Sequence, residues 1–470
     1  MVAERTFDVV IIGAGPAGEV VAARLVERGR TVAIVESELV GGECSFWACM
    51  PSKALLRAGE VLDEVRRVPG AREAVTGKLD VAAVLERRDA IVNDLQDDHQ
   101  VPWLEDRGIE LVRGHGRLDG ERRVRVGDEV LTAREAVVVA TGTGAAIPSI
   151  SGLADVAPWT NREATTAAAA PGRLLVLGGG VVGVELAQAW ASLGSAVTLV
   201  EAAPRILPRE EPFASEDVAA GLRERGVDVR EGVKATAATR EDGAVVLTLE
   251  TDERVVGDEI LVAVGRRPLT DDIGLDSVGL RPGGYLETDD RLQVPGLPWL
   301  YALGDVNGRS LLTHMGKYQA RVLADAIDGG TLRATRDDAG APRVVFTDPQ
   351  VAAVGLTEQQ ARDAALDVVV VSHPTSATAG ASFVGRNARG TTRFVIDRGR
   401  ETVVGATFTG SEVADLLQAA TLAVTAEIPV ERLWDAVPPF PTRSELWLKL
   451  LEQYETVTRE RSRDAVPSAA

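Results

Sequence analysis

The stretch FDVVIIGAGPAGEVVAARLVERGRTVAIVE, residues 7–36, decides the fold of this chain. Its apolar run over residues 7–12 is typical of a strand that is buried on both faces of a parallel sheet. A turn with Gly13, Gly15 and Gly18 follows, then a helical segment, then a second strand that ends at Glu36. Glycines allow a tight turn and a close approach to a pyrophosphate, and a carboxylate can accept a hydrogen bond from a ribose hydroxyl. The stretch therefore predicts a dinucleotide-binding βαβ unit.

A second unit with the same plan is RLLVLGGGVVGVELAQAWASLGSAVTLVE, residues 173–201. Its glycines are Gly178, Gly180 and Gly183, and its acid is Glu201. In both units the acid follows the first glycine by 23 positions. A single G-x-G-x-x-G pattern is weak evidence, but here it occurs twice, each time between a strand and a helix. The sequence predicts that the chain binds two dinucleotides.

The composition limits the partners that we expect. A length of 470 residues corresponds to about three domains. The net charge of −19 disfavours a nucleic-acid backbone or an anionic membrane surface. No apolar run is long enough to span a bilayer, and the N-terminus lacks the pattern of a signal peptide. We therefore expect a cytoplasmic protein that binds no nucleic acid and no membrane.

The rest of the sequence predicts an α/β fold with a C-terminal part of different character. Buried strands are expected within 135–148, 258–268 and 300–306, whereas residues 161–172 (NREATTAAAAPG) look like a low-complexity connector. From about residue 340, strand patterns such as TTRFVIDR alternate with helical stretches such as SELWLKLLEQY, which indicates an α+β domain. The polar residues 457–470 are expected to form a flexible tail.

The only two cysteines of the chain, Cys44 and Cys49, lie in one short segment, GGECSFWACMPSK (41–53). In a cytoplasmic protein such a pair is more often catalytic or metal-binding than a structural cross-link. A tetrahedral zinc site needs four ligands, and the histidines of the chain lie far away in the sequence. We therefore expect no metal site.

Taken in order, these motifs resemble those of the pyridine nucleotide–disulfide oxidoreductases, flavoproteins that include dihydrolipoyl dehydrogenase, glutathione reductase and mercuric reductase. The resemblance covers nearly the whole chain and rests on GAGPAG, the C-x-x-x-x-C-x-P-S-K block, VVVATG, GGGVVGVELA, AVGRRP, ALGD and PTRSE. It implies an enzyme with two Rossmann-like domains, for FAD and NAD, and a C-terminal dimerisation domain that forms a homodimer. The implied boundaries are 1–155 and 273–338 for the FAD-binding domain, 156–272 for the NAD(P)-binding domain and 339–456 for the dimerisation domain.

The resemblance also implies which residues bind the two cofactors. Those expected around FAD are Gly13, Gly15, Pro16, Ala17, Gly18, Glu36, Gly42, Glu43, Lys53, Gly116, Thr141, Gly142, Gly304, Asp305 and Thr313. Those expected around the nicotinamide nucleotide are Gly178, Gly180, Val181, Val182, Gly183, Glu201, Val233 and Gly265. A carboxylate at Glu201 favours NADH, because it suits a free ribose hydroxyl and repels a phosphate. Arg205 lies close enough downstream to leave NADPH possible.

The catalytic residues that the resemblance implies are Cys44, Cys49, Lys53, Glu185 and Glu445. The cysteines would form a redox-active disulfide that takes electrons from the flavin, and a helix that starts near the first cysteine would stabilise a thiolate. Two buried free cysteines are the alternative. Lys53 would lie near the flavin and pair with Glu185, and the alternative for Glu185 is an exposed acid on a helix.

The spacing of the cysteines constrains the backbone between them if they are to form a disulfide. Five residues of regular helix rise about 7.5 Å, whereas a disulfide allows roughly 4.4–6.8 Å between the two Cα atoms. We therefore expect the segment between them to be distorted, and a strained disulfide is easier to reduce.

Phe440 marks a departure from the family. Most members have a His-Pro-Thr-x-Ser-Glu motif whose histidine is a base supplied by the partner subunit, and this chain has FPTRSE instead. The remaining Glu445 either pairs with Lys449 on the same helix or takes part in proton transfer. Loss of a general base typically costs about 10²–10⁴-fold in rate, so lipoamide and glutathione chemistry are disfavoured. Mercury reduction is also disfavoured, because the extra C-terminal cysteines that it uses are missing.

A second departure surrounds the cysteines. Many relatives have threonine at position 43 and smaller or polar residues between the cysteines, and this chain has Glu43, Phe46 and Trp47. Either these rings and Phe440 of the partner make the approach to the disulfide apolar, or Phe46 and Trp47 point into the core. We expect an enzyme that passes electrons from NADH through FAD and the cysteine pair to an apolar or aromatic acceptor, such as a bulky disulfide or a quinone. The alternatives are a dihydrolipoyl dehydrogenase-like or mercuric reductase-like enzyme and a redox sensor with little turnover.

Overall fold

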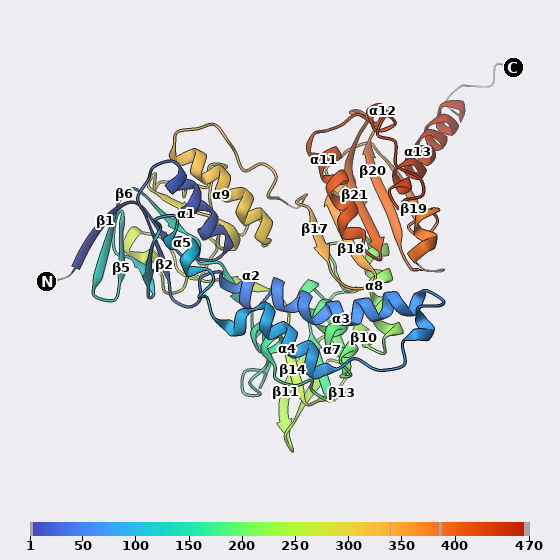
Figure 1. Ribbon diagram of the computed structural model, residues 1–470, viewed down its shortest axis with the longest axis horizontal. Helices are drawn as coiled ribbons and strands as arrows, with labels where there is room; N and C mark the ends of the chain where they lie inside the picture. The colour runs from blue at the N-terminus through green and yellow to red at the C-terminus, as the bar shows by residue number, and fades with distance from the viewer. Residues whose placement is uncertain (1–2, 339, 385–387, 465–470) are drawn as a thin grey trace.

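The first apolar run forms strand β1 (Ala3–Ile12), which lies inside the sheet of the first lobe in the computed structural model (Figure 1). The structure describes residues 3–338, 340–384 and 388–464. β1 pairs in parallel with β2 (Val32–Glu36) and β6 (Glu129–Val139). Val9 packs into the hydrophobic cluster on one face of the sheet and Val10 into the cluster on the other. The prediction of a strand buried on both faces is confirmed.

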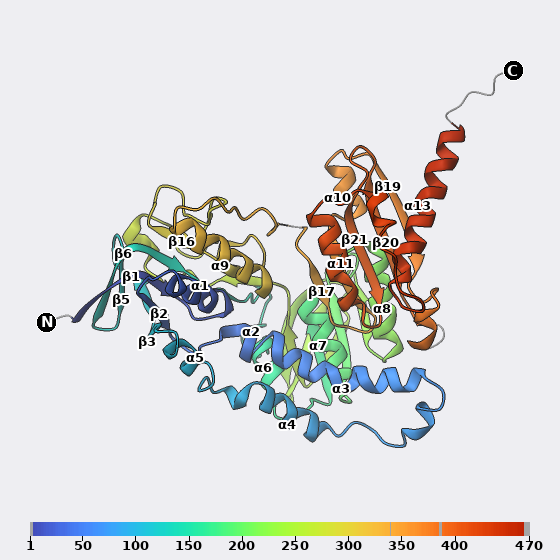
Figure 2. The same ribbon diagram turned by 45° about the horizontal axis from the view of Figure 1, so that its top comes forward.

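The first lobe is built from two separate parts of the chain. Its main sheet has the order β3-β2-β1-β6-β5-β4, and β16, which follows the second dinucleotide unit, pairs in parallel with the end of β6. Helices α1 and α9 lie side by side over one face of this sheet (Figures 1 and 2). The other elements of this lobe are β3 (Glu110–Arg113), β4 (Gly116–Leu118), β5 (Arg123–Val126), β16 (Leu300–Ala302), α1 (Pro16–Glu27), α2 (Gly42–Phe46), α3 (Cys49–Arg67), α4 (Val81–Ile91), α5 (Val101–Glu105), α9 (Thr313–Ile327) and the short 3₁₀ helices η1 (Arg72–Ala74), η2 (Asn93–Leu95), η3 (Leu275–Val278) and η4 (Gly304–Asn307).

The second unit forms a lobe of its own around the parallel sheet β10-β9-β8-β14. A three-stranded antiparallel sheet, β11-β12-β13, packs against one face of it, and helices α7 and α8 cover the other. A two-stranded antiparallel sheet, β7 (Thr143–Ala145) with β15 (Arg266–Pro268), joins this lobe to the first. The elements of the second lobe are α6 (Asn161–Thr166), β8 (Arg173–Leu177), α7 (Val181–Ser192), β9 (Ala196–Glu201), α8 (Pro212–Glu224), β10 (Asp228–Glu231), β11 (Ala235–Glu241), β12 (Ala244–Leu249), β13 (Arg254–Gly257) and β14 (Glu259–Val262).

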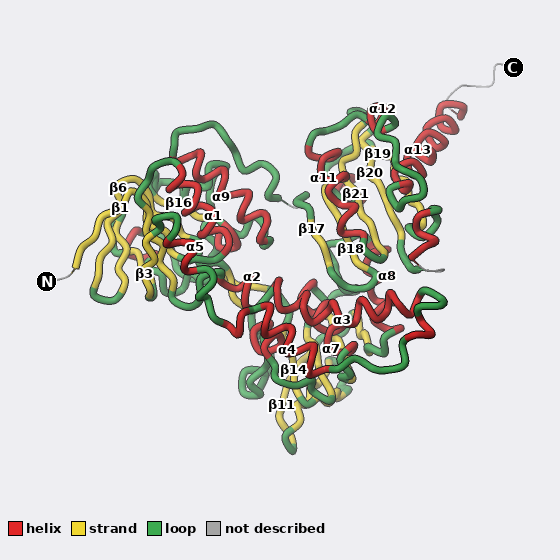
Figure 3. The backbone as a smooth tube through the Cα atoms, in the orientation of Figure 1, coloured by secondary structure: helices red, strands yellow, loops and turns green. Residues whose placement is uncertain are grey.

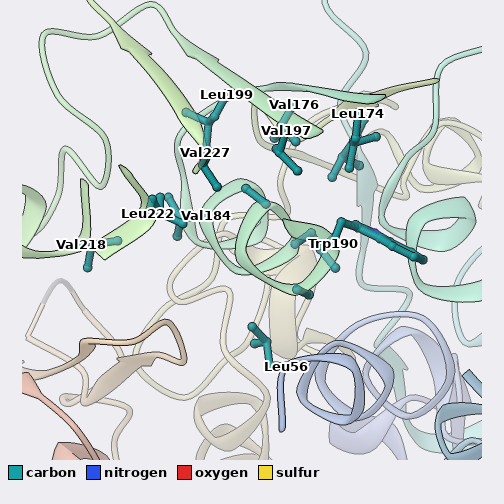
Figure 4. Packing of buried hydrophobic residues seen from close by; sticks show 14 of the residues in the cluster. Leu56, Leu174, Val176, Val184, Trp190, Val197, Leu199, Val218, Leu222 and Val227 are labelled. Carbon is teal, nitrogen blue, oxygen red and sulfur yellow. The ribbon is translucent and has the colours of Figure 1, made fainter. Parts of the chain in front are cut away.

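The core of the second lobe also receives helix α3 of the first. Trp190 of α7 is fully buried in the cluster that Leu174 of β8 and Leu222 of α8 share (Figure 4). Leu56 of α3 enters the same cluster from the opposite side of α7 (Figure 4). The helix that begins at the second cysteine is therefore held by the packing of both dinucleotide lobes.

The third lobe has the α+β character predicted from residue 340 on. Its five-stranded antiparallel sheet has the order β17-β18-β21-β20-β19, and α11 and α13 pack against it. Figure 3 shows that helices and strands occur together in each of the three lobes. The elements are β17 (Arg343–Val345), β18 (Gln350–Gly355), α10 (Glu358–Asp363), β19 (Val368–Pro374), η5 (Gly380–Val384), β20 (Thr391–Asp397), β21 (Thr402–Gly410), η6 (Val413–Leu416), α11 (Leu417–Thr425), α12 (Val430–Leu433) and α13 (Glu445–Asp464).

Two expectations from the sequence need correction. Residues 161–166 are not part of a connector but form helix α6, because Thr160 and Glu163 make a capping box at its start. At the end of the chain, α13 continues to Asp464, so residues 457–464 of the expected tail are helical, and 465–470 lie outside the described residues.

Candidate active site

The cysteine segment is two helices with a break between them. Cys44 lies in α2, which ends at Phe46, and Cys49 is the first residue of α3. Between them, Trp47 (φ −133°, ψ 0°) and Ala48 (φ −131°, ψ −96°) leave the helical conformation. The predicted distortion is confirmed. A short helix does begin near the first cysteine, as expected, but the 19-residue helix begins at the second, so its N-terminus faces Cys49.

The two thiols differ in their acidity. Both are free and half-buried, and their side chains lie within hydrogen-bonding reach of each other. The thiol of Cys44 donates to the sulfur of Cys49 and lowers its pKa to about 6, with help from the Thr313 hydroxyl at 3.5 Å and the charge of Lys53. The same hydrogen bond, together with burial, raises the pKa of Cys44. The pair therefore holds one proton on Cys44 and a thiolate at Cys49, at a helix N-terminus that favours the negative charge.

Lys53 and Glu185 form an ion pair between two lobes. The Lys53 Nζ atom of α3 lies 2.7 Å from a carboxylate oxygen of Glu185 on α7. The side chain of Glu185 is only 3% exposed, so the alternative of an exposed helix acid is wrong. Its second oxygen accepts a hydrogen bond from the backbone N–H of Phe346 in the third lobe, at 2.9 Å. The ring of Phe346 lies under the Lys53 ammonium, 4.8 Å from the ring centroid.

The first glycine turn has the shape that a pyrophosphate needs. Gly13 has a φ of +107°, and a Cβ atom on Gly18 would come within 2.1 Å of the Gly13 carbonyl oxygen, so both positions require glycine. Gly15, in contrast, faces open space, where a Cβ atom would meet nothing within 4 Å. The Glu36 carboxylate is held by the backbone N–H groups of Ala14 (2.7 Å) and Glu38 (2.8 Å). These residues fit the adenosine and pyrophosphate of FAD.

The other residues expected around FAD gather at the same edge of the sheet. Gly13 follows β1, Glu36 ends β2, and the pairs Thr141–Gly142 and Gly304–Asp305 come just after β6 and β16. In parallel sheets ligands bind at the carboxyl ends of the strands. The hydroxyl of Thr141 is buried and has no hydrogen-bond partner among the described residues, so it is free for a ligand.

Gly42, Gly116 and Asp305 belong to the same expected set. A Cβ atom on Gly42 would come within 2.9 Å of the Gly15 Cα, which places the start of α2 on the first turn. Gly116 packs tightly between Ile12 and Val35. Burial raises the pKa of Asp305, whose carboxylate accepts a hydrogen bond of 2.8 Å from the Thr143 hydroxyl.

The second glycine turn repeats the geometry of the first. The residue before each helix has nearly the same backbone angles, −73° and 176° at Gly15 and −73° and −177° at Gly180. A Cβ atom on Gly183 would lie 1.9 Å from the Gly178 carbonyl oxygen. The Glu201 carboxylate accepts from the N–H groups of Gly179 and Ala203, both at 2.6 Å. Val181 and Val182 begin α7, Val233 follows β10 and Gly265 follows β14.

The side chain of Arg205 makes its hydrogen bonds with other groups of the protein. Its guanidinium donates to the carbonyls of Leu207, Pro208 and Glu210 and to the Ser215 hydroxyl, at 2.9–3.3 Å. These contacts hold it against the start of α8, so it is poorly placed to bind a ribose phosphate.

The residues that depart from the family have different surroundings. Phe46 is 1% exposed and packs into the core, as one alternative held. Trp47 is half-buried beneath the guanidinium of Arg162, 4.1 Å from the ring centroid. Glu43 accepts hydrogen bonds from Arg162 (2.9 and 3.1 Å) and Asn161 (2.8 Å). The approach to the cysteines is therefore less aromatic than the sequence suggested.

The C-terminal departure lies on the surface. Phe440 is 77% exposed in the loop before α13, and Val437 of the same loop is 79% exposed. Figures 1 and 2 both show α13 well apart from α2. Of the two alternatives for Glu445, the pair with Lys449 is wrong, because Lys449 pairs with Glu452 at 3.0 Å and Glu445 accepts from the Gly380 N–H at 3.4 Å.

Sequence reasoning missed four polar residues near the cysteines, Thr143, Asn161, Arg162 and Arg266. The alanines of residues 161–172 suggested a connector and hid Asn161 and Arg162. The T-x-x-E pattern of Thr160 and Glu163 was the signal that could have revealed the helix that carries them.

Two features of the described part of the chain bear on other functions. Among the described residues, no helix has both the length and the apolar character needed to cross a membrane. In the same part of the chain, no three His, Cys, Asp or Glu side chains group together so that they could hold a metal ion.

Comparison with known proteins matches nearly the whole chain. Residues 7–320 match the family described as pyridine nucleotide-disulphide oxidoreductase, and residues 341–450 match the dimerisation domain of the same family. A dihydrolipoyl dehydrogenase of Thermus scotoductus is 34% identical over 452 residues, which cover 94% of this chain and 96% of that protein. A mercuric reductase of Staphylococcus aureus is 32% identical over 445 residues, which cover 93% of this chain and 81% of that protein.

Two solved structures with the same fold illustrate the match. The Cu(II) complex of the HOCl-induced flavoprotein disulfide reductase RclA from Escherichia coli has a TM-score of 0.85 at 26% identity, and covers 96% of this chain and 99% of that one. LpdA from Mycobacterium tuberculosis has a TM-score of 0.84 at 25% identity, and covers 96% of this chain and 100% of that one.

The acidity of Cys49 can be tested by alkylation. In the reduced holoenzyme, we expect the rate of iodoacetamide modification of Cys49 to be half-maximal near pH 6, because the thiolate forms as the pH rises through its pKa. Cys44 should stay unreactive until alkaline pH. The variant Cys44→Ala removes the hydrogen-bond donor and should shift the half-maximal rate of Cys49 to higher pH. Peptide mass spectrometry measures both sites, and a Cys49 that stays unreactive below pH 8 would contradict the assignment.

The second glycine turn can be tested separately from the first. Gly183→Ala places a Cβ atom against the Gly178 carbonyl, and backbone cannot move away as a flexible side chain can. We expect NADH affinity, measured by calorimetry, to fall about 10-fold or more, while the FAD content stays that of the wild type. Gly77→Ala, in open space, is the control. Unchanged NADH affinity, or loss of FAD, would show that the turn has another role.

Proposed function

The chain belongs to the pyridine nucleotide-disulphide oxidoreductases, FAD-dependent enzymes that take electrons from NAD(P)H, and we propose that it passes electrons from NADH to the Cys44–Cys49 pair and on to an apolar or aromatic acceptor. A bulky disulfide or a quinone has this character. The observation that carries the proposal is the unequal cysteine pair, in which a thiolate at Cys49 lies beside Thr313, Lys53 and the proton-bearing Cys44.

The protein groups have distinct parts in this reaction. When bound, FAD would supply the two-electron chemistry that connects NADH with the disulfide. Two-electron reduction breaks the S–S bond, and with one proton from the medium on Cys44, Cys49 keeps the negative charge. Lys53, held by Glu185, contributes positive charge near Cys49, and the start of α3 adds the dipole of a helix N-terminus. An acceptor that takes up two electrons returns both sulfurs to the disulfide, and the proton of Cys44 is released to the acceptor or the medium.

The choice of NADH rests on the second glycine turn. The Glu201 carboxylate is fixed by two backbone N–H groups at the end of β9, where it can accept from a ribose hydroxyl. A phosphate at that position would meet this negative charge. Arg205, the cation that could have compensated for it, is bonded to the loop before α8.

The character of the acceptor rests on the loop before α13. The chain has the dimerisation domain of its family, and we propose a homodimer in which this loop of the second copy faces the cysteine pair. Phe440 and Val437 are exposed there, and neither can exchange a proton. An acceptor that needs no base at this position, and that gains from apolar contact, suits such a surface.

The proposed relay is tested with Cys44→Ser in the holoenzyme. We expect NADH-dependent reduction of an aromatic disulfide to fall about 100-fold or more, because no disulfide can form. Anaerobic titration with NADH should show uptake of four electrons per subunit in the wild type and two in the variant. If the variant reduces a naphthoquinone as fast as the wild type, the flavin transfers electrons to that acceptor directly and the relay is not used.

The role of Phe440 is tested by restoring a base. Phe440→His recreates a His-Pro-Thr-x-Ser-Glu sequence, and we expect dihydrolipoamide oxidation to rise by up to about 100-fold. Val437→His, equally exposed in the same loop, is the control and should change little. If the wild type already oxidises dihydrolipoamide rapidly and Phe440→His changes nothing, the enzyme is an ordinary dihydrolipoyl dehydrogenase.

A further inference from the structure

At the break between the cysteines, the backbone carbonyl of Trp47 has no partner in the helix that follows. In a continuous helix the carbonyl of Trp47 would accept from the N–H four residues later, but that residue is Pro51, which has no N–H. Helix α6 supplies donors from the second lobe: Asn161 Nδ2 at 2.8 Å and Thr165 Oγ1 at 3.2 Å. Asn161 is 5% exposed and Thr165 is 1% exposed. Two buried side chains therefore satisfy the Trp47 carbonyl, which Pro51 leaves without a helical donor.

The same helix also holds α2 and the ring of Trp47. Arg162 donates to the Glu43 carboxylate at 2.9 and 3.1 Å, and Asn161 donates to the other oxygen of Glu43 at 2.8 Å. The Arg162 guanidinium covers the Trp47 ring and reaches Glu38 after β2 at 2.8 Å. Figure 2 shows α6 next to α2 and α3. α6 therefore contacts the cysteine segment at Glu43, which directly precedes Cys44, and at the break.

A polar chain links this contact to the expected flavin site. Asn161 Oδ1 accepts from Arg266 at 3.4 Å, and Arg266 Nε donates to the Thr143 hydroxyl at 2.7 Å. Thr143 donates in turn to Asp305 at 2.8 Å. Groups connected in this way fix one another's positions, so the break in the cysteine segment and Asp305 share one rigid network.

We propose that Asn161 and Arg162 are positioning residues that hold the break at Trp47 and so keep Cys44 within reach of Cys49. The proposal rests on the proposed function of the two cysteines as a redox pair. Because α6 belongs to the second lobe, the geometry of the disulfide site depends on a contact between lobes and not on the cysteine segment alone. Release of the contact lets the two helices separate, which lowers the effective concentration of one thiol for the other.

Two measurable quantities should change when the contact is removed. The equilibrium constant for forming the Cys44–Cys49 disulfide against glutathione should fall about 10-fold, which corresponds to about 30 mV for a two-electron couple. Cys49 should also lose the hydrogen bond from Cys44, so the half-maximal pH of its alkylation should rise from near 6 toward that of an ordinary thiol.

The experiment compares Arg162→Gln and Asn161→Ala with the wild-type holoenzyme. Each protein is equilibrated in glutathione redox buffers, its thiols are alkylated, and the fraction of disulfide is measured by mass spectrometry. Arg173→Gln is the matched control, because Arg173 makes a similar bidentate contact with Asp258 in the same lobe, at 2.6 and 3.0 Å, away from the cysteines. The control should keep both the equilibrium constant and the alkylation profile.

The outcomes separate this inference from the proposed function. A wild-type enzyme that forms no Cys44–Cys49 disulfide in any buffer would refute the proposed function itself. If the disulfide forms but both variants keep the wild-type equilibrium constant and alkylation profile, α6 has only a structural role, even where the melting temperature falls. If Arg162→Gln does not fold, Arg162→Lys carries the same test, because lysine keeps the charge but cannot bind two carboxylates in the bidentate manner of arginine.

Discussion

The arrangement of this protein depends on one break in a helix, at Trp47 and Ala48. Without it, Cys44 and Cys49 would lie on a regular helix too far apart for their sulfurs to interact. With it, Cys49 begins a new helix, and the thiol of Cys44 can donate to it. Pro51 leaves the Trp47 carbonyl without a helical donor, and a carbonyl without a hydrogen bond is costly. The hydrogen bonds from α6 supply what the local chain cannot.

Helix α3 extends this constraint to the whole molecule. It begins at Cys49, pairs through Lys53 with the second lobe, and packs Leu56 into the core of that lobe. At its other end Arg67 binds Asp348 of the third lobe, which also accepts from Arg225 of the second at 2.5 Å. Removing one partner from such a buried ion pair leaves an uncompensated charge and is strongly destabilising. These contacts therefore fix the positions of the three lobes relative to α3, the helix that carries Cys49.

The sequence predicted best where the signal was local. The two glycine turns and their acids were found correctly, because the clashes that require Gly18 and Gly183 are with the first glycine of the same turn. The distortion of the cysteine segment followed from spacing alone. The errors concern partners. Residues 161–166 looked like a connector, and a pair of Glu445 with Lys449 was one of two alternatives, yet Arg162 binds Glu43 and Lys449 binds Glu452.

By itself, the sequence determined the two dinucleotide units, the α/β class, the family and the cysteine pair, because periodicity and short motifs record contacts between near neighbours. Only the tertiary structure decided what surrounds that pair. Glu185 meets Lys53 across 132 residues, and Arg162 meets Glu43 across 119. Contacts between residues so far apart in the sequence produce no periodic pattern in it, because each depends on how separately folded lobes pack. The pKa of Cys49 is lowered first by the hydrogen bond from Cys44, within the motif, and further by the Thr313 hydroxyl, which only the fold brings beside it.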